Sequence, residues 1–302
     1  MDLKQIEYIV KIAEENNITR AAEKLFITQS ALNQQLLKIE KELGIQLFYR
    51  SRTNWHPTQA GEIYLKAARE MLNLKRETYT RISDLAERQQ STLTVGLTPG
   101  RGIQMFSEVY PEFHKSHYYV NVIPLERNVK EQQALISSGN MDIGFQTFDS
   151  SFRPMNTCEL INTEEFYLAI PRFHPYAKKA APEGEPFTVA NLYELREEPF
   201  VLMYRDSTAY PLINTIFKAA GFEPQVLFET RNFNTIVTMI SSGTCCGILP
   251  YSYIRDRLDT LACFALPSHP TWDINVSYRR GSYLSRAAKD FIQLARNYWS
   301  EH

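Results

Sequence analysis

A predicted helix near the amino end of the chain carries polar side chains whose chemistry suits the reading of base pairs. Its apolar residues Leu32, Leu36, Ile39 and Leu43 are spaced four, three and four residues apart, as on one face of an α-helix. The opposite face carries amides, a hydroxyl and an amine, at Gln29, Ser30, Asn33, Gln34 and Lys38. Amide side chains form paired hydrogen bonds with base edges in the major groove of DNA. This face, capped at its start by Thr28, therefore predicts binding to double-stranded DNA.

A first short helix and a tight turn must position that face. Residues 19–25 predict a helix for which Thr19 is a good N-cap, because its hydroxyl can accept a bond from a free backbone N–H. Phe26 and Ile27 form the predicted turn, and Thr28 caps the second helix. Two helices with a brief turn, the second exposing polar residues at its start, are typical of a helix-turn-helix on DNA. A small helical hairpin with no role in DNA binding is the alternative.

Flanking segments complete the predicted DNA-binding unit. Residues 3–15 have apolar side chains at helical spacing and are expected to pack beneath the two short helices. Residues 49–57 are basic and aromatic and end at a proline, which predicts a β-wing. Arg50 and Arg52 in this wing are candidates for contact with phosphates or the minor groove. For Arg50, an ion pair with the helices is an equally good interpretation, whereas the position of Arg52 near the tip favours DNA.

A long helix follows the wing and predicts self-association. Thr58 caps it, and it is expected to run to about Arg88 with no glycine or proline after Gly61. Apolar or small side chains recur every three or four residues, at Ala60, Tyr64, Ala67, Met71, Leu74, Thr78, Ile82 and Leu85. Such a narrow stripe needs a partner. A homodimer, with its seam at Tyr64, Ala67, Met71, Leu74 and Thr78, would place two recognition helices on two half-sites. Packing on the chain's own downstream domain is the alternative.

Composition places limits on the class of protein. The chain has 302 residues, 44% apolar and 22% charged, which is typical of two or three globular domains. No apolar run approaches the roughly 20 residues that span a bilayer, and the amino end lacks the features of a secretory signal, so the cytoplasm is the expected compartment. Residues 1–90 carry 14 Lys and Arg against 12 Asp and Glu, and residues 91–302 carry 19 against 22. A net charge of +2 on the amino part means that DNA affinity must rest on placed contacts and dimerisation.

Cysteine spacing and motif searches argue against a metal site and against catalysis. Cys158, Cys245, Cys246 and Cys263 form no C-x-x-C pair and have no accompanying histidine cluster, so buried reduced thiols are favoured over a redox sensor. Neither a metal nor a cofactor is expected. The sequence also lacks G-x-S-x-G, G-x-x-x-x-G-K-[ST], G-x-G-x-x-G and H-E-x-x-H, so no enzyme is predicted.

The remainder of the chain alternates between strand and helix patterns. Predicted strands cover residues 93–97, 119–123, 141–145, 166–170, 200–203, 226–229, 246–250 and 274–278. Predicted helices cover residues 103–113, 129–138, 210–220, 235–242 and 285–298. This βαβαβ alternation predicts parallel sheets with right-handed crossovers.

The amino-terminal part resembles the DNA-binding region of the LysR-type transcriptional regulators. The resemblance rests on residues 1–90, at Leu3, Tyr8, Ala13, Glu14, Thr19, Arg20, Ala21, Ala22, Leu25, Thr28, Gln29, Ala31, Leu32, Gln35, Ile39, Glu40, Leu43, Gly44, Leu47, Phe48, Arg50, Thr58, Ala60 and Gly61. Two departures stand in the recognition helix. Ser30 replaces a usual proline, and Asn33 and Gln34 replace a usual Ser-Arg pair.

The resemblance continues more weakly along the rest of the chain and implies three domains. These are a winged helix-turn-helix over residues 1–58, a linker and dimerisation helix over 59–90, and an effector-binding domain over 91–302. The last is expected to have two α/β lobes like those of periplasmic binding proteins, with lobe I at 91–161 and 268–302 and lobe II at 162–267. The two crossings between lobes are expected near residues 160–163 and 264–267.

A ligand is expected where strands end, because ligands of open α/β sheets bind at the carboxyl edge. Lobe I offers Thr98, Pro99, Gly100 and Arg101 after its first strand, with Asn128 and Gln146 after the next two. Lobe II offers Met203, Tyr204, Arg205 and Phe233. The resemblance implies that Thr98 supplies a hydroxyl to the effector. Arg101 and Arg205 would suit a carboxylate effector, although each arginine taken alone is better explained as a solvated or salt-bridged side chain.

These observations predict a transcriptional regulator controlled by a small molecule. Its expected partners are double-stranded DNA, a small-molecule effector such as a carboxylate, a second copy of itself in a homodimer or homotetramer, and RNA polymerase. Closure of the lobes on the effector would rearrange the dimers on DNA. The alternative is a ligand-binding protein with little or no specific DNA binding.

Overall fold

A computed structural model describes residues 2–51, 55–86, 90–182 and 184–301 of the chain. Internal contacts divide it into two units, Met1–Glu87 and Arg88–His302. Among the described residues, no helix is both long enough and apolar enough to cross a membrane.

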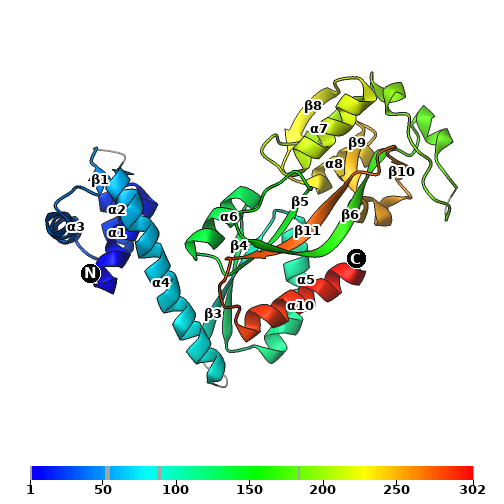
Figure 1. Ribbon diagram of the computed structural model, residues 1–302. Helices are drawn as coiled ribbons and strands as arrows, with labels where there is room; N and C mark the ends of the chain where they lie inside the picture. The colour runs from blue at the N-terminus through cyan, green and yellow to red at the C-terminus, as the bar shows by residue number, and fades with distance from the viewer. Residues whose placement is uncertain (1, 52–54, 87–89, 183, 302) are drawn as a thin grey trace. The chain divides into compact units, whose positions relative to one another are not determined.

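The first unit is a small helical domain with a two-stranded wing (Figure 1). Its elements are α1 (Leu3–Glu15), α2 (Ile18–Lys24), α3 (Gln29–Leu43), β1 (Phe48–Tyr49), β2 (His56–Pro57) and α4 (Gln59–Leu85). β1 and β2 pair antiparallel, as expected for a wing. The core joins one apolar face of each helix to Phe48 and Trp55 of the wing. The periodicity of α3 is confirmed, because Leu32, Leu36 and Ile39 are buried.

Caps fix where these helices begin, and one of them differs from the prediction. Thr28 caps α3 by accepting the Ala31 N–H, and Thr58 caps α4 by accepting the Gly61 N–H, both as predicted. The prediction that Thr19 caps α2 is wrong. The cap is Asn17, whose side-chain oxygen accepts N–H bonds from residues 19 and 20 at 2.9 and 3.1 Å. An amide oxygen two residues earlier can serve both free N–H groups, so α2 starts one residue before Thr19.

The turn between α2 and α3 holds an unusual residue. Phe26 has a φ of 54°, in the left-handed region, and its side chain is 95% exposed. The Ile27 N–H bonds the carbonyl of Ala22, and the Phe26 N–H bonds the carbonyl of Glu23. This pair of bonds is the Schellman arrangement, which usually places glycine where Phe26 stands.

The long helix α4 has one buried and one exposed apolar face. Tyr64, Leu65 and Ala68 are buried against the rest of the first unit. The other face exposes Ile63, Met71, Leu74, Ile82 and Leu85. Of the predicted seam, Tyr64 therefore packs within its own unit, and Ile63 takes its place on the exposed face. The described helix ends at Leu85, and the predicted end near Arg88 lies outside the described residues.

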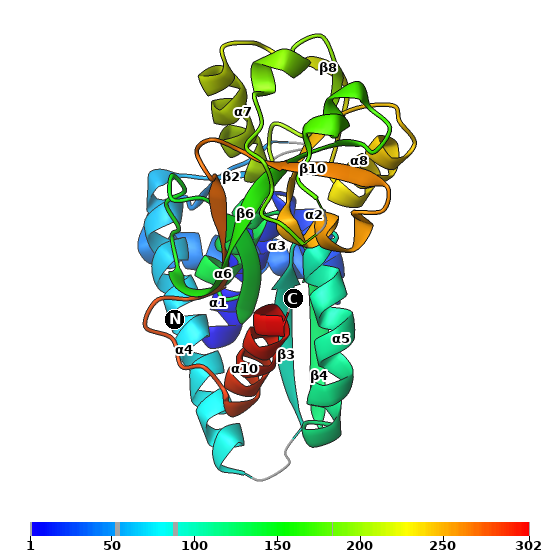
Figure 2. The same cartoon turned by 90° about the vertical axis from the view of Figure 1, so that its right-hand side faces the viewer.

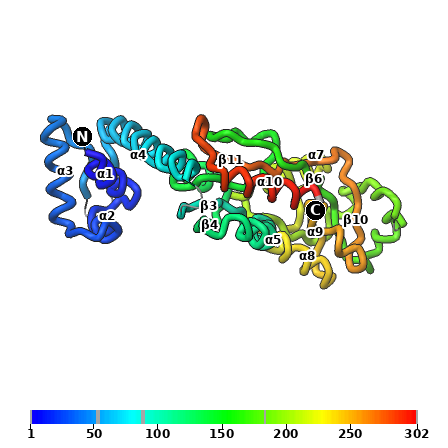
Figure 3. The backbone as a smooth tube through the Cα atoms, turned by 90° about the horizontal axis from the view of Figure 1, so that it is seen from below, coloured from blue at the N-terminus to red at the C-terminus, as the bar shows by residue number. Residues whose placement is uncertain are grey.

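Lobe I of the second unit is a sheet with helices on both faces (Figures 1 and 2). In chain order it contains β3 (Ser91–Leu97), α5 (Arg101–Ser116), β4 (Val120–Glu126), α6 (Val129–Ser138) and β5 (Ile143–Phe148), and it is completed by β11 (Thr271–Tyr278) and α10 (Arg286–Glu301). β3 pairs parallel with β4 and β5, as predicted, whereas β11 pairs antiparallel with β5. Helix α10 packs against α5 (Figure 3). Alternate side chains of β11 separate the faces, with Ile274 and Val276 in the apolar core and Ser277 facing α6.

Lobe II carries the second apolar core. Its elements are β7 (Pro199–Met203), α7 (Ala209–Ala220), β8 (Gln225–Thr230), α8 (Phe233–Ser241), β9 (Gly247–Pro250), α9 (Tyr251–Ile254) and β10 (Leu261–Ala265), with short 3₁₀ turns at Pro175–Lys179, Leu192–Leu195 and Arg255–Arg257. β7 and β8 are parallel, and β9 and β10 both pair antiparallel with β6 (Thr157–Pro171). Phe166, Phe200, Phe217 and Phe264 are fully buried in this core.

One strand, β6 (Thr157–Pro171), runs through both lobes. Residues 157–165 pair with β11 of lobe I, and residues 167–171 pair with β10 of lobe II. The change of partner lies between residues 165 and 167, and the return runs between β10 and β11. The first change lies a few residues beyond the predicted crossing at 160–163, whereas the return, between Ala265 and Thr271, overlaps the predicted crossing at 264–267. The amino half of β6 has the sequence TCELINTEE. Because most of these side chains are polar, the apolar pattern did not predict a strand there.

Candidate DNA interface and effector site

The start of α3 presents the predicted base-reading side chains to solvent. Gln29, Ser30, Gln34 and Lys38 are exposed, and Asn33 is half-buried. Because Thr28 caps the helix, these side chains project from its first turns. The structure thus leaves four of the five side chains exposed on α3, and their contact with DNA stays a prediction.

The wing is held to the helices by a buried carboxylate. Glu40 is 6% exposed, and its Oε1 accepts the Leu47 N–H at 2.8 Å while its Oε2 pairs with Arg50. The Arg50 guanidinium also lies 5.6 Å from the centre of the Trp55 ring. The sequence allowed either an ion pair with the helices or a contact with DNA for Arg50. The structure shows the ion pair, and contact of Arg50 with DNA stays a prediction. Arg52 lies outside the described residues.

In lobe I, parallel pairing places the predicted effector residues at one edge. Leu97 pairs with Glu126 of β4 and with Phe145 of β5, so the residues that follow each strand lie side by side. Thr98 is half-buried there, and Pro99 is exposed. Asn128 caps α6 by accepting the Glu131 N–H at 2.9 Å.

In lobe II, the corresponding edge carries two pairs of charges. The guanidinium of Arg231 lies 4.8 Å from the centre of the Tyr204 ring and pairs with Asp206 at 2.8 Å. Arg205 has an 80% exposed side chain and pairs with Glu229 at 3.4 Å. Its long, exposed ion pair is weak and leaves the guanidinium accessible.

The two edges face each other. The Thr208 hydroxyl at the start of α7 donates to the Thr147 carbonyl of β5 at 2.6 Å. A methyl group built on Gly100 of lobe I would lie 3.6 Å from the Tyr253 hydroxyl and 3.7 Å from the side-chain oxygen of Asn232 in lobe II. Gly100 of the loop at residues 98–100 therefore lies close to Asn232 and Tyr253 of lobe II.

Four predicted effector residues are buried and make contacts within the protein. Arg101 is 7% exposed and pairs with Glu164 of β6. Gln146 is 1% exposed, and its side-chain oxygen accepts the Gln133 amide at 2.7 Å beneath α6. Phe233 and Met203 belong to the core of lobe II. For these residues the structure shows a packing role, and their contact with an effector stays a prediction.

The four cysteines are all free thiols, and none has the low pKa of a reactive thiolate. Burial raises the pKa of Cys245 to about 11 and that of Cys246 and Cys263 to about 12. Burial also raises the pKa of Cys158. Within the described parts of the chain, no group of three or more His, Cys, Asp or Glu is placed to hold a metal ion.

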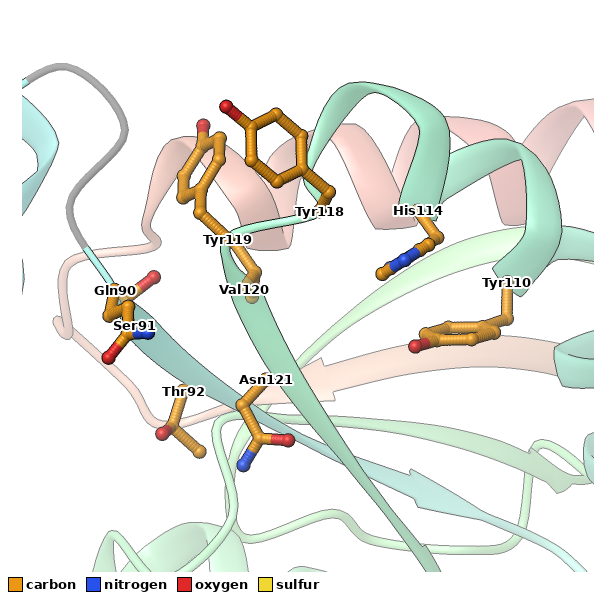
Figure 4. Close-up of a pocket in the computed structure, with 9 residues that line it drawn as sticks. All are labelled: Gln90, Ser91, Thr92, Tyr110, His114, Tyr118, Tyr119, Val120 and Asn121. Atoms are coloured by element: carbon orange, nitrogen blue, oxygen red, sulfur yellow. The ribbon is translucent and has the colours of Figure 1, made fainter.

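A separate open pocket lies at the opposite ends of β3 and β4 (Figure 4). Its volume is about 580 Å³, and its lining includes Tyr110 and His114 of α5. The Tyr118 and Tyr119 rings stand edge to face, 5.6 Å apart, at its rim. None of the predicted effector residues lines this pocket.

A winged helix-turn-helix unit joined to a two-lobed α/β unit defines a transcriptional regulator that is controlled by a small molecule. Two family models match the chain, the LysR substrate binding domain over residues 86–300 and the bacterial regulatory helix-turn-helix protein of the lysR family over residues 3–62. The chain therefore belongs to the LysR family of bacterial transcriptional regulators.

Individual relatives agree with this assignment. An uncharacterised HTH-type transcriptional regulator of Bacillus subtilis, YwbI, is 26% identical over 99% of this chain and 97% of its own length. AlsR of the same organism is 26% identical over 83% of this chain and 81% of its own length.

Solved structures share the fold. A cysteine variant of full-length OxyR from Pseudomonas aeruginosa matches with a TM-score of 0.68 at 21% identity, covering 98% of this chain and 94% of that one. Full-length CbnR in complex with its target DNA matches with a TM-score of 0.57 at 24% identity, covering 98% and 99%.

Proposed function

We propose that a dimer of this chain binds an operator with two half-sites in the cytoplasm, and that a small effector held between the two lobes controls transcription there. The observation that carries the DNA-binding part is the exposed polar surface at the start of α3. Gln29, Ser30 and Gln34 expose hydrogen-bonding groups of short reach, which suits base edges better than phosphates. The wing, which the Glu40 carboxylate holds in place, would lie on the sugar-phosphate backbone of the DNA beside α3.

Dimerisation through α4 supports the same proposal. Ile63 and Leu74 are 69% and 66% exposed on a helix that is otherwise polar on this side. A second copy of the chain is the expected partner of this stripe, because identical stripes on two helices are self-complementary. A two-fold dimer also matches an operator with two half-sites. The low net charge of the amino part makes the second recognition helix necessary for affinity.

For the effector, we propose a small molecule bound by residues 98–100 of lobe I and by the edge of lobe II near Tyr204. If it is a carboxylate, Arg205 is the cation that could receive it, since its present partner Glu229 is 3.4 Å away and the side chain is exposed. Contact with RNA polymerase would follow if the regulator activates transcription.

A footprint on the DNA upstream of the protein's own coding region tests specific binding, with Gln29→Ala as the discriminating variant. We expect protection over two or more helical turns. Gln29→Ala should weaken binding to this site by about 1–3 kcal/mol and leave binding to random DNA unchanged, because the lost contacts are to bases.

Lys38→Ala and Gln225→Ala serve as controls. The first removes an exposed charge and should weaken specific and random binding alike, whereas the second removes an exposed amide of the other unit and should change neither. Equal losses on both DNAs for Gln29→Ala would refute base reading by α3. Absence of protection even at low salt would favour a ligand-binding protein without specific DNA binding.

A further inference from the structure

A buried ion pair lies where the chain passes between the lobes. Arg101 and Glu164 are each 7% exposed. Arg101 is the first residue of α5 and directly follows residues 98–100, the loop proposed to meet the effector. Glu164 lies on β6, one residue before the strand exchanges β11 for its lobe II partners. The pair thus connects the effector loop to the hinge of the domain.

The Glu164 carboxylate also accepts two N–H groups, one of them from lobe II. Its Oε1 accepts the backbone N–H of Ser252, at the start of α9 in lobe II, at 2.7 Å. Its Oε2 accepts the indole N–H of Trp272, on the strand that returns to lobe I, at 3.0 Å. Because each oxygen is occupied, the carboxylate cannot follow one lobe without breaking a bond to the other.

The Arg101 side chain is fixed on its other face as well. Its guanidinium lies 4.3 Å from the centre of the Trp299 ring of α10. Burial lowers the pKa of Arg101 to about 10, so the group stays charged at neutral pH. The Glu164 carboxylate is the opposite charge paired with it. Separating such a pair in the interior leaves an uncompensated charge, which is far more costly than breaking a surface ion pair.

From these contacts we propose that Arg101 and Glu164 are positioning residues, which hold the effector loop against lobe II and order the site before an effector arrives. Arg101 then offers no charge to the effector. This inference rests on the proposed function, because it takes residues 98–100 as part of the effector site. It explains why the loop carries Gly100 with a φ of 77°, since the chain must turn there to bring Arg101 inward.

Hydrogen exchange of the full-length protein without effector tests the coupling. Glu164→Gln keeps the size and one acceptor of the side chain but removes its charge. We expect amide exchange in peptides covering residues 98–104 and 251–255 to rise together by about tenfold or more, because both lose the same anchor. Arg101→Lys, which keeps the charge, should raise exchange less than Arg101→Met.

Thr208→Val is the matched control. It removes a separate contact between the lobe edges, the 2.6 Å bond to the Thr147 carbonyl. Exchange should rise near residues 147 and 208 while residues 98–104 stay protected. If Glu164→Gln accelerates exchange in only one of the two peptides, or equally throughout the domain, the positioning role is wrong.

The double variant Arg101→Met/Glu164→Gln guards against loss of folding, because no buried charge is left unpaired. It should fold and still show fast exchange in both peptides. Protection equal to that of the unsubstituted protein would overturn the proposal. The footprint is a separate readout: protected DNA with unchanged exchange would refute the positioning role and leave the proposed function intact.

Discussion

At the scale of single residues, Phe26 has the backbone conformation least suited to its side chain. Most residues with a Cβ avoid the left-handed region, and helices that end in a Schellman arrangement usually have glycine or asparagine at this position. The side chain of Phe26 gains no burial in return, since it is 95% exposed. Its position in the turn before α3 makes a functional reason for its presence a reasonable hypothesis.

Phe26→Asn should therefore stabilise the protein. We expect the free energy of unfolding of the first unit to rise by about 0.5–1 kcal/mol, because asparagine tolerates a positive φ at lower cost. Thermal unfolding followed by circular dichroism measures this.

Gly44→Ala supplies the opposite case for that prediction. Gly44 ends α3 with a φ of 70° and has nothing within 4 Å of a built Cβ, so alanine would add only backbone strain. It should lower stability by about 1 kcal/mol. A Phe26→Asn protein that is less stable than the unsubstituted one would show that the aromatic ring contributes contacts we have not identified.

Single residues also show which features can be predicted from the sequence and which cannot. Thr28 and Thr58 could be identified as caps because capping depends on neighbours within three residues. Glu164 could not be identified as a hinge anchor, because its partners lie 63 to 108 positions away and Glu165 beside it looks the same in the sequence. The pleat of β6 in the folded sheet decides which of the two carboxylates, Glu164 or Glu165, turns inward.

At the scale of elements, periodicity predicted the helices well because each one buries an apolar face at a spacing of three and four residues. It failed at α4 in one respect. The periodic stripe included Tyr64, but two apolar stripes run along this helix, and Tyr64 packs with Leu65 and Ala68 in the first unit. The sequence could not separate the stripe that faces α1 from the one left exposed.

Leu74→Lys should disrupt self-association through the exposed stripe. In a two-fold dimer each substitution is present twice, so we expect the dimer dissociation constant to rise about 100-fold or more. Analytical ultracentrifugation measures this directly.

The matched control for Leu74 is Thr80→Lys, which adds the same charge on another side of α4, where the Thr80 hydroxyl bonds only the Arg76 carbonyl of its own helix. It should leave association unchanged. If both variants dissociate equally, charge repulsion and not the stripe controls assembly; if neither does, the dimer forms elsewhere.

At the scale of the whole molecule, β6 prevents the two lobes from behaving as separate domains. Its 15 residues span about 50 Å and supply strands to both sheets. Loss of either core would leave half of this strand unpaired. The family resemblance implied two lobes and two crossings, but the continuity of the strand is a tertiary fact, since residues 157–163 are stabilised by pairing with β11 and none of them is buried.

We expect the two lobes to unfold together. Hydrogen exchange measured across a urea series should give the same midpoint for peptides of β3 in lobe I and β9 in lobe II. A peptide of α3 in the first unit is the internal comparison. Its unfolding midpoint can differ, because the internal contacts divide the chain before residue 88. Two distinct midpoints within residues 90–301 would contradict a shared unfolding unit.

The position of β11 also bears on how the protein is made. This strand is the last one in the chain, yet it lies in the middle of the sheet, between β6 and β5. The chain is synthesised from its amino end. The first half of β6 and one edge of β5 therefore lack their partner strand until residues 271–278 have left the ribosome. Unpaired strand edges invite pairing with other chains. Nascent molecules of this regulator should therefore depend on chaperones until synthesis is nearly complete, and a message truncated before codon 271 should yield aggregates in place of a smaller folded domain.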